Sequence, residues 1–241
     1  MNHKTKIFFL WLLGLLLLSP FIHALPTSPN IIYISNSTVT TGSANRSQDA
    51  KGTITTLVLS ANQQDYKWKA YVGNVSGQLS LDDATGKSVY SWNIGQGATG
   101  KVFVSRASSV NWVNVSCVNQ SVIDNEEAAF GTSSDQADSI NKTFNYTIHR
   151  SFLVGTKSFS NDSCRSTTTY INDAAQAMTD AAFFQEVLLK DDLAGSLVYT
   201  TMIEQQHLGY DGVTNHDFQL LVAENESTTV STTYYFFVEI G

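Results

Sequence analysis

Apolar and polar side chains alternate along much of this chain, and this period of two constrains the fold more than any other feature. Residues 66–72 and 78–82 alternate in this way. Successive side chains of an extended strand point to opposite faces, so the pattern gives each strand one buried face. Turn residues follow at 82–86 and alternation resumes at 89–94, which predicts a β-hairpin.

The alternation recurs at short intervals, as in an antiparallel β-sandwich. Further strands are predicted at residues 31–35, 54–60, 101–106, 110–115, 146–154, 197–203 and 218–223. Residues 234–240 also alternate and are strongly apolar. We expect this terminal strand at the centre of a sheet, because an exposed, flat, apolar edge invites aggregation. The expected fold class is mainly β, an antiparallel β-sandwich.

Two regions interrupt the alternation. Residues 121–145 contain helix formers and acidic side chains, which predicts one or two short helices over a sheet edge. Residues 174–190 are ambiguous, because the alanines at their start favour a helix whereas Val187 and Leu189 also fit a strand. We expect a helix or a loop there, followed by a strand.

The N-terminus has the pattern of a secretory signal peptide. Lys4 and Lys6 precede an apolar run, and a plausible cleavage point follows Ala24. The alternative is a membrane anchor, since residues 7–24 span 18 positions, although a crossing helix needs about 20 apolar residues. We expect residues 1–24 to be removed and residues 25–241 to form a single β-sandwich-like domain. A membrane is a partner only if the segment is retained.

The charge balance excludes one class of partner. Cleavage after Ala24 leaves 12 basic against 21 acidic residues, a net charge of −9. Such an acidic surface does not retain nucleic acid, because it offers few cations to replace the counterions of the phosphates. We therefore expect no nucleic-acid partner. The predicted signal peptide leads us to expect an extracellular or cell-surface location.

The chain has two cysteines, Cys117 and Cys164, and we expect them to form a disulfide. A zinc site or a nucleophilic thiol would need partner residues. The sequence has no Cys-X-X-Cys motif and no histidine within four residues of either cysteine.

Asn-X-Ser/Thr triplets are more frequent than the composition would give by chance. Nine asparagines begin such a triplet: Asn36, Asn45, Asn74, Asn114, Asn119, Asn141, Asn145, Asn161 and Asn225. Each is a potential N-glycan acceptor in an exported chain. We expect most of them to be exposed, because a bulky polar glycan does not fit into a packed core.

Motifs for catalysis are weak, and we expect no cofactor and no metal. Residues 95–101 match the start of a phosphate-binding loop, but Val102 stands where that loop needs Ser or Thr. Asp211, Asn215 and Asp217 offer oxygen ligands that would suit calcium, yet a polar turn is the favoured interpretation.

Paired catalytic groups are equally hard to find. The sequence has no His-Glu-X-X-His motif and no Gly-X-Ser-X-Gly motif. The glutamates that could form a glycosidase pair are scattered along the chain: Glu186, Glu204, Glu224 and Glu239.

Several stretches resemble short exported archaeal surface glycoproteins, a β-rich group without an assigned activity. The stretches are residues 68–77, 197–204, 209–212, 217–222 and 233–240. The resemblance implies a surface location and a style of fold, and it implies no catalytic residue.

Three functions remain as hypotheses. The first is a structural or adhesive surface glycoprotein without catalysis. The second is a carbohydrate-binding module, with Trp68, Trp92 and Trp112 as stacking residues beside Tyr71 and Tyr90, although core packing is the favoured role of these rings. The third is an exported hydrolase, which would need two carboxylates facing each other in a cleft.

The N-terminal part of the exported chain suggests self-assembly, with surface glycans as the other candidate partner. Residues 25–41 include Ile31, Tyr33 and Val39, and such an apolar segment could add as a strand to a neighbouring subunit. Pairing within its own sheet is the favoured alternative.

Overall fold

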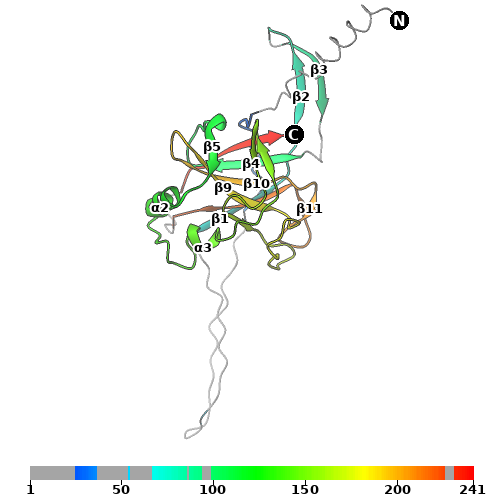
Figure 1. Cartoon of the computed structure of the whole chain (residues 1–241). Helices are drawn as coiled ribbons and strands as arrows, with labels where there is room; N and C mark the ends of the chain where they lie inside the picture. Colours follow the sequence, from blue (N-terminus) through cyan, green and yellow to red (C-terminus); the bar gives the residue numbers. More distant parts are fainter. Residues whose placement is uncertain (1–24, 37–53, 55–66, 86, 94–98, 226–230) are drawn as a thin grey trace, which may run out of the picture.

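The computed structural model describes residues 25–36, 54, 67–85, 87–93, 99–225 and 231–241 (Figure 1). All strand pairs in this part of the chain are antiparallel, and two short α-helices accompany them. The predicted class, a mainly β sandwich with one or two short helices, is confirmed.

The central element is a six-stranded sheet with the order β14-β4-β10-β9-β5, in which β8 also pairs with β9. Its strands are β4 (Gly100–Ser105), β5 (Val115–Cys117), β8 (Ser166–Thr168), β9 (Gln185–Asp191), β10 (Leu197–Met202) and β14 (Tyr235–Ile240). The strands that were predicted at 101–106, 197–203 and 234–240 correspond to β4, β10 and β14.

Both faces of this sheet are buried, which explains why its strands are more continuously apolar than a half-exposed strand would be. In β4, Val102 and Val104 face one side and Phe103 faces the other. In β10, Tyr199 faces the same side as the two valines of β4, and Val198 faces the side of Phe103. The alternation of the sequence therefore separates two apolar clusters on opposite faces of the sheet.

The first face is covered by a second sheet and the helices. The covering elements are β1 (Trp68–Gly73), β13 (Phe218–Ala223), α2 (Gln120–Ala129) and α3 (Ile140–Thr143). β1 pairs with β13, and Leu220 and Val222 of β13 lie in one cluster with Ile123 of α2 and Leu188 of β9. Burying each such side chain contributes about 2 kcal/mol, so this cluster fixes the second sheet and α2 onto the first sheet.

Side-chain caps begin both helices. Asn119 Oδ1 accepts a hydrogen bond from the Val122 N–H at the start of α2, at 3.1 Å. Ser139 Oγ accepts from the Lys142 N–H at the start of α3, also at 3.1 Å. These contacts satisfy backbone donors that a helix start leaves unpaired. α2 begins one residue before the predicted region 121–145, and α3 lies within it.

The opposite face carries a hairpin and a short 3-10 helix. The elements are β6 (Phe152–Val154), β7 (Lys157–Phe159) and η1 (Trp112–Asn114). The buried Trp112 ring lies 4.9 Å from the Phe103 ring and 5.1 Å from the Phe237 ring. η1 therefore turns its tryptophan into the core.

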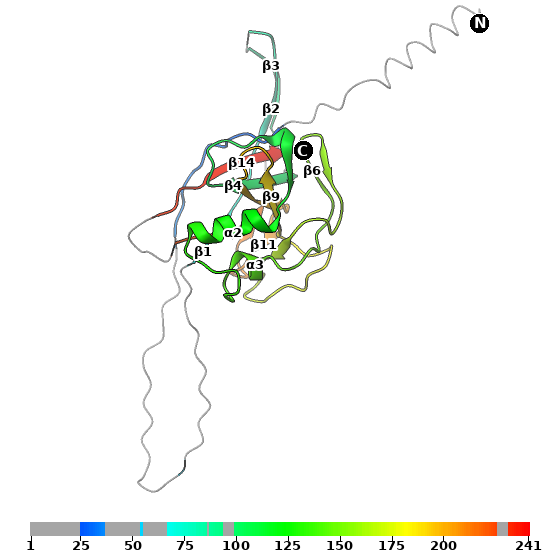
Figure 2. The ribbon, with the colours of Figure 1, turned by 60° about the vertical axis from the view of Figure 1, so that its left-hand side comes forward.

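Two further hairpins complete the described structure: β2 (Gln78–Asp82) with β3 (Ser88–Asn93), and β11 (His207–Leu208) with β12 (Asn215–His216). The β2–β3 hairpin confirms the prediction for 78–94. Figures 1 and 2 show it projecting away from the packed sheets.

The expected central position of the terminal strand was wrong. β14 lies at the edge of the six-stranded sheet and pairs with β4 alone among the described strands. Its other edge is covered at one point, where Thr27 and Val238 exchange backbone hydrogen bonds of 2.9 and 2.7 Å. The apolar side chain of Phe237 is buried by packing on Trp112, so an edge position does not expose it.

Some predicted strands differ from the structure. Residues 31–35 form no strand with the other described residues. Residues 110–114 lead into and form η1 before β5 starts at Val115. Within 146–154 the paired strand is limited to β6, with an isolated bridge at Tyr146. Residues 174–184 are a loop, which continues into β9. The predicted strand at 54–60 lies outside the described residues apart from the exposed Ile54.

Candidate functional site

Cys117 and Cys164 form a disulfide, as predicted. The bond joins the last residue of β5 to the segment before β8, with the two Cα atoms 5.0 Å apart. The cysteines are 47 positions apart, and closing a loop of that size stabilises the fold by about 4 kcal/mol through its effect on the unfolded chain.

A buried histidine organises the backbone beside this disulfide. His149 Nε2 accepts hydrogen bonds from the N–H groups of Ser163 and Cys164, at 3.1 and 3.0 Å. Its Nδ1 lies 2.8 Å from the carbonyl oxygen of Arg150. A carbonyl oxygen only accepts, so the proton is on Nδ1 and Nε2 is left as the acceptor. His149 thus serves as a neutral structural residue.

The predicted glycan acceptors lie predominantly on the surface. Eight of the nine are described, and none of these is buried. Six are exposed: Asn36, Asn74, Asn114, Asn119, Asn145 and Asn161. Asn141 and Asn225 are half-buried, and Asn45 lies outside the described residues. Attachment at the six exposed positions requires no displacement of the core.

Asn141 and Asn145 line a shallow cavity of about 380 Å³ with Lys142, Tyr146, Thr147 and Arg165. The Asn141 side chain is already hydrogen-bonded at both ends. Its Nδ2 donates to the Ser134 carbonyl at 3.3 Å, and its Oδ1 accepts from Arg165 at 2.8 Å. Glycosylation of Asn141 would have to replace the first of these contacts.

The tryptophans proposed for ligand stacking occupy separate places. Trp112 is buried between Phe103 and Phe237. Trp68 is half-buried against the first core cluster, and its Nε1 donates to the Asp138 carbonyl at 2.8 Å. Trp92 belongs to β3, but its side chain lies outside the described residues.

The two tyrosines proposed beside them also lie apart. Tyr71 packs edge-on against Phe236, and Tyr90 is an exposed residue of β3. Trp68, Trp112 and Tyr71 therefore contribute to packing rather than to a common stacking platform.

The acidic loop at 211–217 organises turns. Asp211 Oδ1 accepts from the N–H groups of Val213 and Thr214, which lowers the pKa of its carboxyl to about 2. The buried Asp217 accepts from the Val75 N–H and from the backbone and side chain of Gln206. Within the described ranges, no group of three or more His, Cys, Asp or Glu side chains is arranged to hold a metal ion.

The four glutamates considered as a glycosidase pair have different surroundings. Glu224 pairs with Lys69 at 2.7 Å, and Glu239 pairs with Lys101 at 3.5 Å. Glu204 pairs with Arg150, and Glu186 accepts from the Leu221 N–H at 2.8 Å. Each carboxylate thus has its own structural partner.

A cleft of about 370 Å³ brings together groups that are distant in the sequence. It is lined by Thr99, Arg150, Phe183, Ile203, Glu204, Gln205 and His207. The ring of Phe183 stacks on His207, with centroids 3.5 Å apart and ring planes 22° apart. Desolvation lowers the pKa of Arg150, which forms an ion pair with Glu204. No motif indicated this cleft.

Two strained residues border the cleft. Phe184 and Gln206 have φ angles of +49° and +52°, in the left-handed region that residues other than glycine rarely adopt. Glu204 accepts from the Phe184 N–H at 3.3 Å, and Asp217 accepts from the Gln206 N–H at 2.9 Å. Buried carboxylates therefore hold both residues in place.

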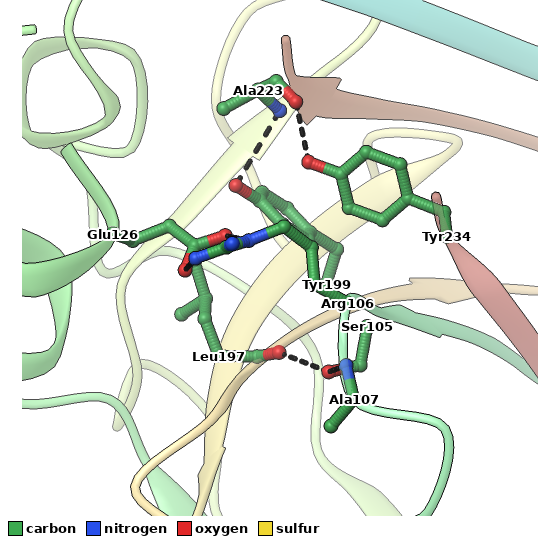
Figure 3. Close-up of polar contacts among 8 residues, drawn as sticks. All are labelled: Ser105, Arg106, Ala107, Glu126, Leu197, Tyr199, Ala223 and Tyr234. Atoms are coloured by element: carbon green, nitrogen blue, oxygen red, sulfur yellow. Dashed lines mark hydrogen bonds and ion pairs between the residues drawn. The ribbon is translucent and has the colours of Figure 1, made fainter. Parts of the chain in front are cut away.

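A polar cluster joins α2 to the six-stranded sheet, and that sheet to β13 (Figure 3). Arg106 donates two hydrogen bonds to the Glu126 carboxylate, at 2.7 and 2.6 Å. Nearby, Tyr199 Oη accepts from the Ala223 N–H at 3.4 Å, and the Tyr234 hydroxyl donates to the Ala223 carbonyl. Burial raises the pKa of both tyrosines, which therefore stay neutral. The two tyrosines fasten β13 to β10 and to the residue before β14.

Among the described residues, no helix is both long enough and apolar enough to cross a bilayer. The predicted signal peptide at 1–24 lies outside them. No family model, curated protein or solved structure matches this chain.

Proposed function

We propose that this chain is an exported surface glycoprotein with a structural or adhesive role. The observation that carries the proposal is the exposure of its acceptors: six of the eight described asparagines are exposed and the other two are half-buried. They occur at a helix cap, beside strands and in loops, so attached glycans would be distributed over several elements of the fold.

The disulfide and the charge support the same location. Disulfides persist in oxidising compartments, and Cys117 and Cys164 are bonded here. A net charge of −9 after cleavage would add to the solubility that glycans confer. The resemblance to exported archaeal surface glycoproteins is consistent with this role, which involves no catalytic step.

The test is to produce the full chain in an archaeal host that glycosylates exported proteins, and to analyse it by intact-glycopeptide mass spectrometry. We expect an N-terminus at Leu25, bonded cysteines, and glycans on the exposed acceptors. Asn125 is the matched control, because it is exposed but lacks Ser or Thr two positions later. A chain that stays in the cytosol, or carries no glycan on any acceptor, would refute the proposal.

Carbohydrate binding is a second candidate function, favoured by the Arg150–Glu204 cleft. Phe183 is 38% exposed and its ring is held in place by His207. An aromatic face beside a charged hydrogen-bonding pair suits a ligand that has both apolar C–H groups and hydroxyls, as saccharides do. The cleft would take a terminal sugar of a neighbouring glycan.

NMR titration of the purified chain with neutral monosaccharides and oligosaccharides tests this second candidate. We expect shifts confined to the cleft, and their loss in Phe183→Ala. Tyr170→Ala is the control, because Tyr170 is an exposed ring outside the cleft lining. Equal binding by both variants, or no shifts for the unmodified chain, would rule out this role.

A further inference from the structure

The N-terminal segment exposes a continuous apolar run. Ile31, Ile32, Tyr33 and Ile34 are all exposed, with Ile32 at 81% and Ile34 at 89%. Residues 30–36 contain no charged side chain. Proteins ordinarily protect exposed strands with charges or prolines, so an unprotected run of this kind favours pairing with another strand.

Local chemistry keeps this run from pairing with its own sheet. Thr27 forms its bridge to Val238, and the same ladder would next place Pro29 opposite Phe236. Proline has no backbone N–H to donate, so the ladder ends after a single bridge. Residues 30–36 therefore continue without a strand partner among the described residues.

The β2–β3 hairpin is suited to receive an added strand, because it is a two-stranded sheet with exposed apolar residues. Its sheet contains two strands in the described part of the chain, and a two-stranded hairpin is marginally stable without further packing. Leu81 is 55% exposed and Val89 is 71% exposed. Residues 78–81 and 88–93 carry no charge. The hairpin also stands away from the packed sheets in both views (Figures 1 and 2).

We propose that residues 30–36 of one copy add as a third strand to the β2–β3 hairpin of a second copy. A third strand would bury isoleucine side chains against the exposed apolar residues of the hairpin and would pair the backbone groups of one hairpin edge. Residues 30–36, 78–81 and 88–93 carry no charge, so pairing between these stretches requires no ion to be desolvated.

The donor of the added strand is residues 30–36, and its acceptor is the β2–β3 hairpin. Because these are different parts of the chain, the contact is head-to-tail. Such a contact extends into an open chain, which keeps one free donor and one free acceptor at its ends, or closes into a ring, in which all are paired. The inference rests on the structural role proposed above and names its partner as a second copy of this chain.

Complementation between two variants tests the proposal. Ile32→Lys/Ile34→Lys removes the donor, and Leu81→Lys/Tyr90→Lys removes the acceptor. Sedimentation velocity of the exported, glycosylated chain should show assemblies for the wild type and monomers for each variant alone. An equimolar mixture of the variants retains one functional donor and one functional acceptor, and it should form a dimer that does not grow further.

The control is Leu193→Lys/Val213→Lys, which adds two lysines at exposed apolar positions elsewhere and should assemble like the wild type. Near-ultraviolet circular dichroism verifies the fold of every variant. A monomeric wild type, self-association of either variant alone, a mixture that stays monomeric, or dissociation of the control would each overturn the proposal. A glycosylated but monomeric chain would overturn only this inference and leave the surface-glycoprotein proposal standing.

Discussion

Glu186 of β9 accepts a hydrogen bond from the backbone N–H of Leu221 in β13, at 2.8 Å. This contact joins the six-stranded sheet to the second sheet in the interior of the sandwich. Glu186 is fully buried, and its Oε1 has no hydrogen-bond partner among the described residues. Burial raises the pKa of Glu186 well above its ordinary value, so folding favours the protonated carboxyl.

The first prediction is that Glu186 makes the fold less stable as pH rises. A carboxyl whose pKa is raised on folding contributes stability that is complete below its unfolded-state pKa, about 4.3, and is lost as pH rises through the folded-state pKa. The loss is at most about 1.4 kcal/mol per pH unit. Glu186→Gln does not titrate and keeps an acceptor for Leu221. We expect denaturant unfolding to show it gaining stability over the wild type between pH 5 and pH 8.

The exposed Asp180→Asn is the control for the loss of one negative charge. It should not reproduce the gain in stability that Glu186→Gln shows between pH 5 and pH 8. Parallel pH profiles for wild type and Glu186→Gln would contradict the first prediction.

The second prediction concerns His149. Replacing it with Phe keeps an aromatic ring but leaves the N–H groups of Ser163 and Cys164 without their acceptor. An unsatisfied buried donor costs about 1–3 kcal/mol, so we expect the free energy of unfolding to fall by about 2–4 kcal/mol. Long-range proton–nitrogen NMR of the wild type should show the proton on Nδ1. A proton on Nε2, or an unchanged stability, would be incompatible with this geometry.

The sequence predicted the elements that local pattern determines. The hairpin at 78–94 and strand β10 follow from alternation, and the disulfide follows from the presence of two cysteines in an exportable chain. The position of β14 could not be predicted in this way, because strand order depends on long-range packing. Residues 31–35 have the composition of a strand, but the ladder that starts at Thr27 ends before it reaches them. It ends because Pro29 has no backbone N–H to donate.

The candidate cleft was beyond sequence reasoning for a related reason. Arg150, Phe183 and Glu204 belong to three separate segments, and none of them lies in a recognisable motif. The two left-handed residues beside the cleft are Phe184 and Gln206, which composition does not mark as special. The tryptophans suggested a binding surface, but Trp68 and Trp112 were better explained by packing.

The third prediction separates the two roles of Asn119, which caps α2 and begins a glycosylation triplet. Ser121→Ala removes the triplet and the hydrogen bond from the Ser121 hydroxyl to Asn119 Oδ1, but it leaves the contact between Asn119 Oδ1 and the Val122 N–H. Asn119→Ala removes all three, and losing such a cap costs about 1 kcal/mol. We expect both variants to lose any glycan at position 119. When the chains carry no glycan, only Asn119→Ala should unfold at a lower denaturant concentration than the wild type. Equal stabilities of the two variants would show that the cap contributes nothing.

The fourth prediction is that the Arg106–Glu126 pair in Figure 3 couples α2 to the sheet through its geometry as well as its charge. Glu126 is buried, and Arg106 also lies 5.0 Å over the Phe130 ring. Arg106→Met would leave the carboxylate without its partner, and we expect a loss of about 2 kcal/mol in unfolding free energy, moderated by the partial exposure of Arg106.

Arg106→Lys keeps the charge but cannot reproduce two parallel hydrogen bonds, so it should lose about half as much. Adding Glu126→Gln to Arg106→Met removes the unpaired charge and should recover about 1 kcal/mol. A double variant whose loss equals the sum of the two single losses would show that the residues act independently.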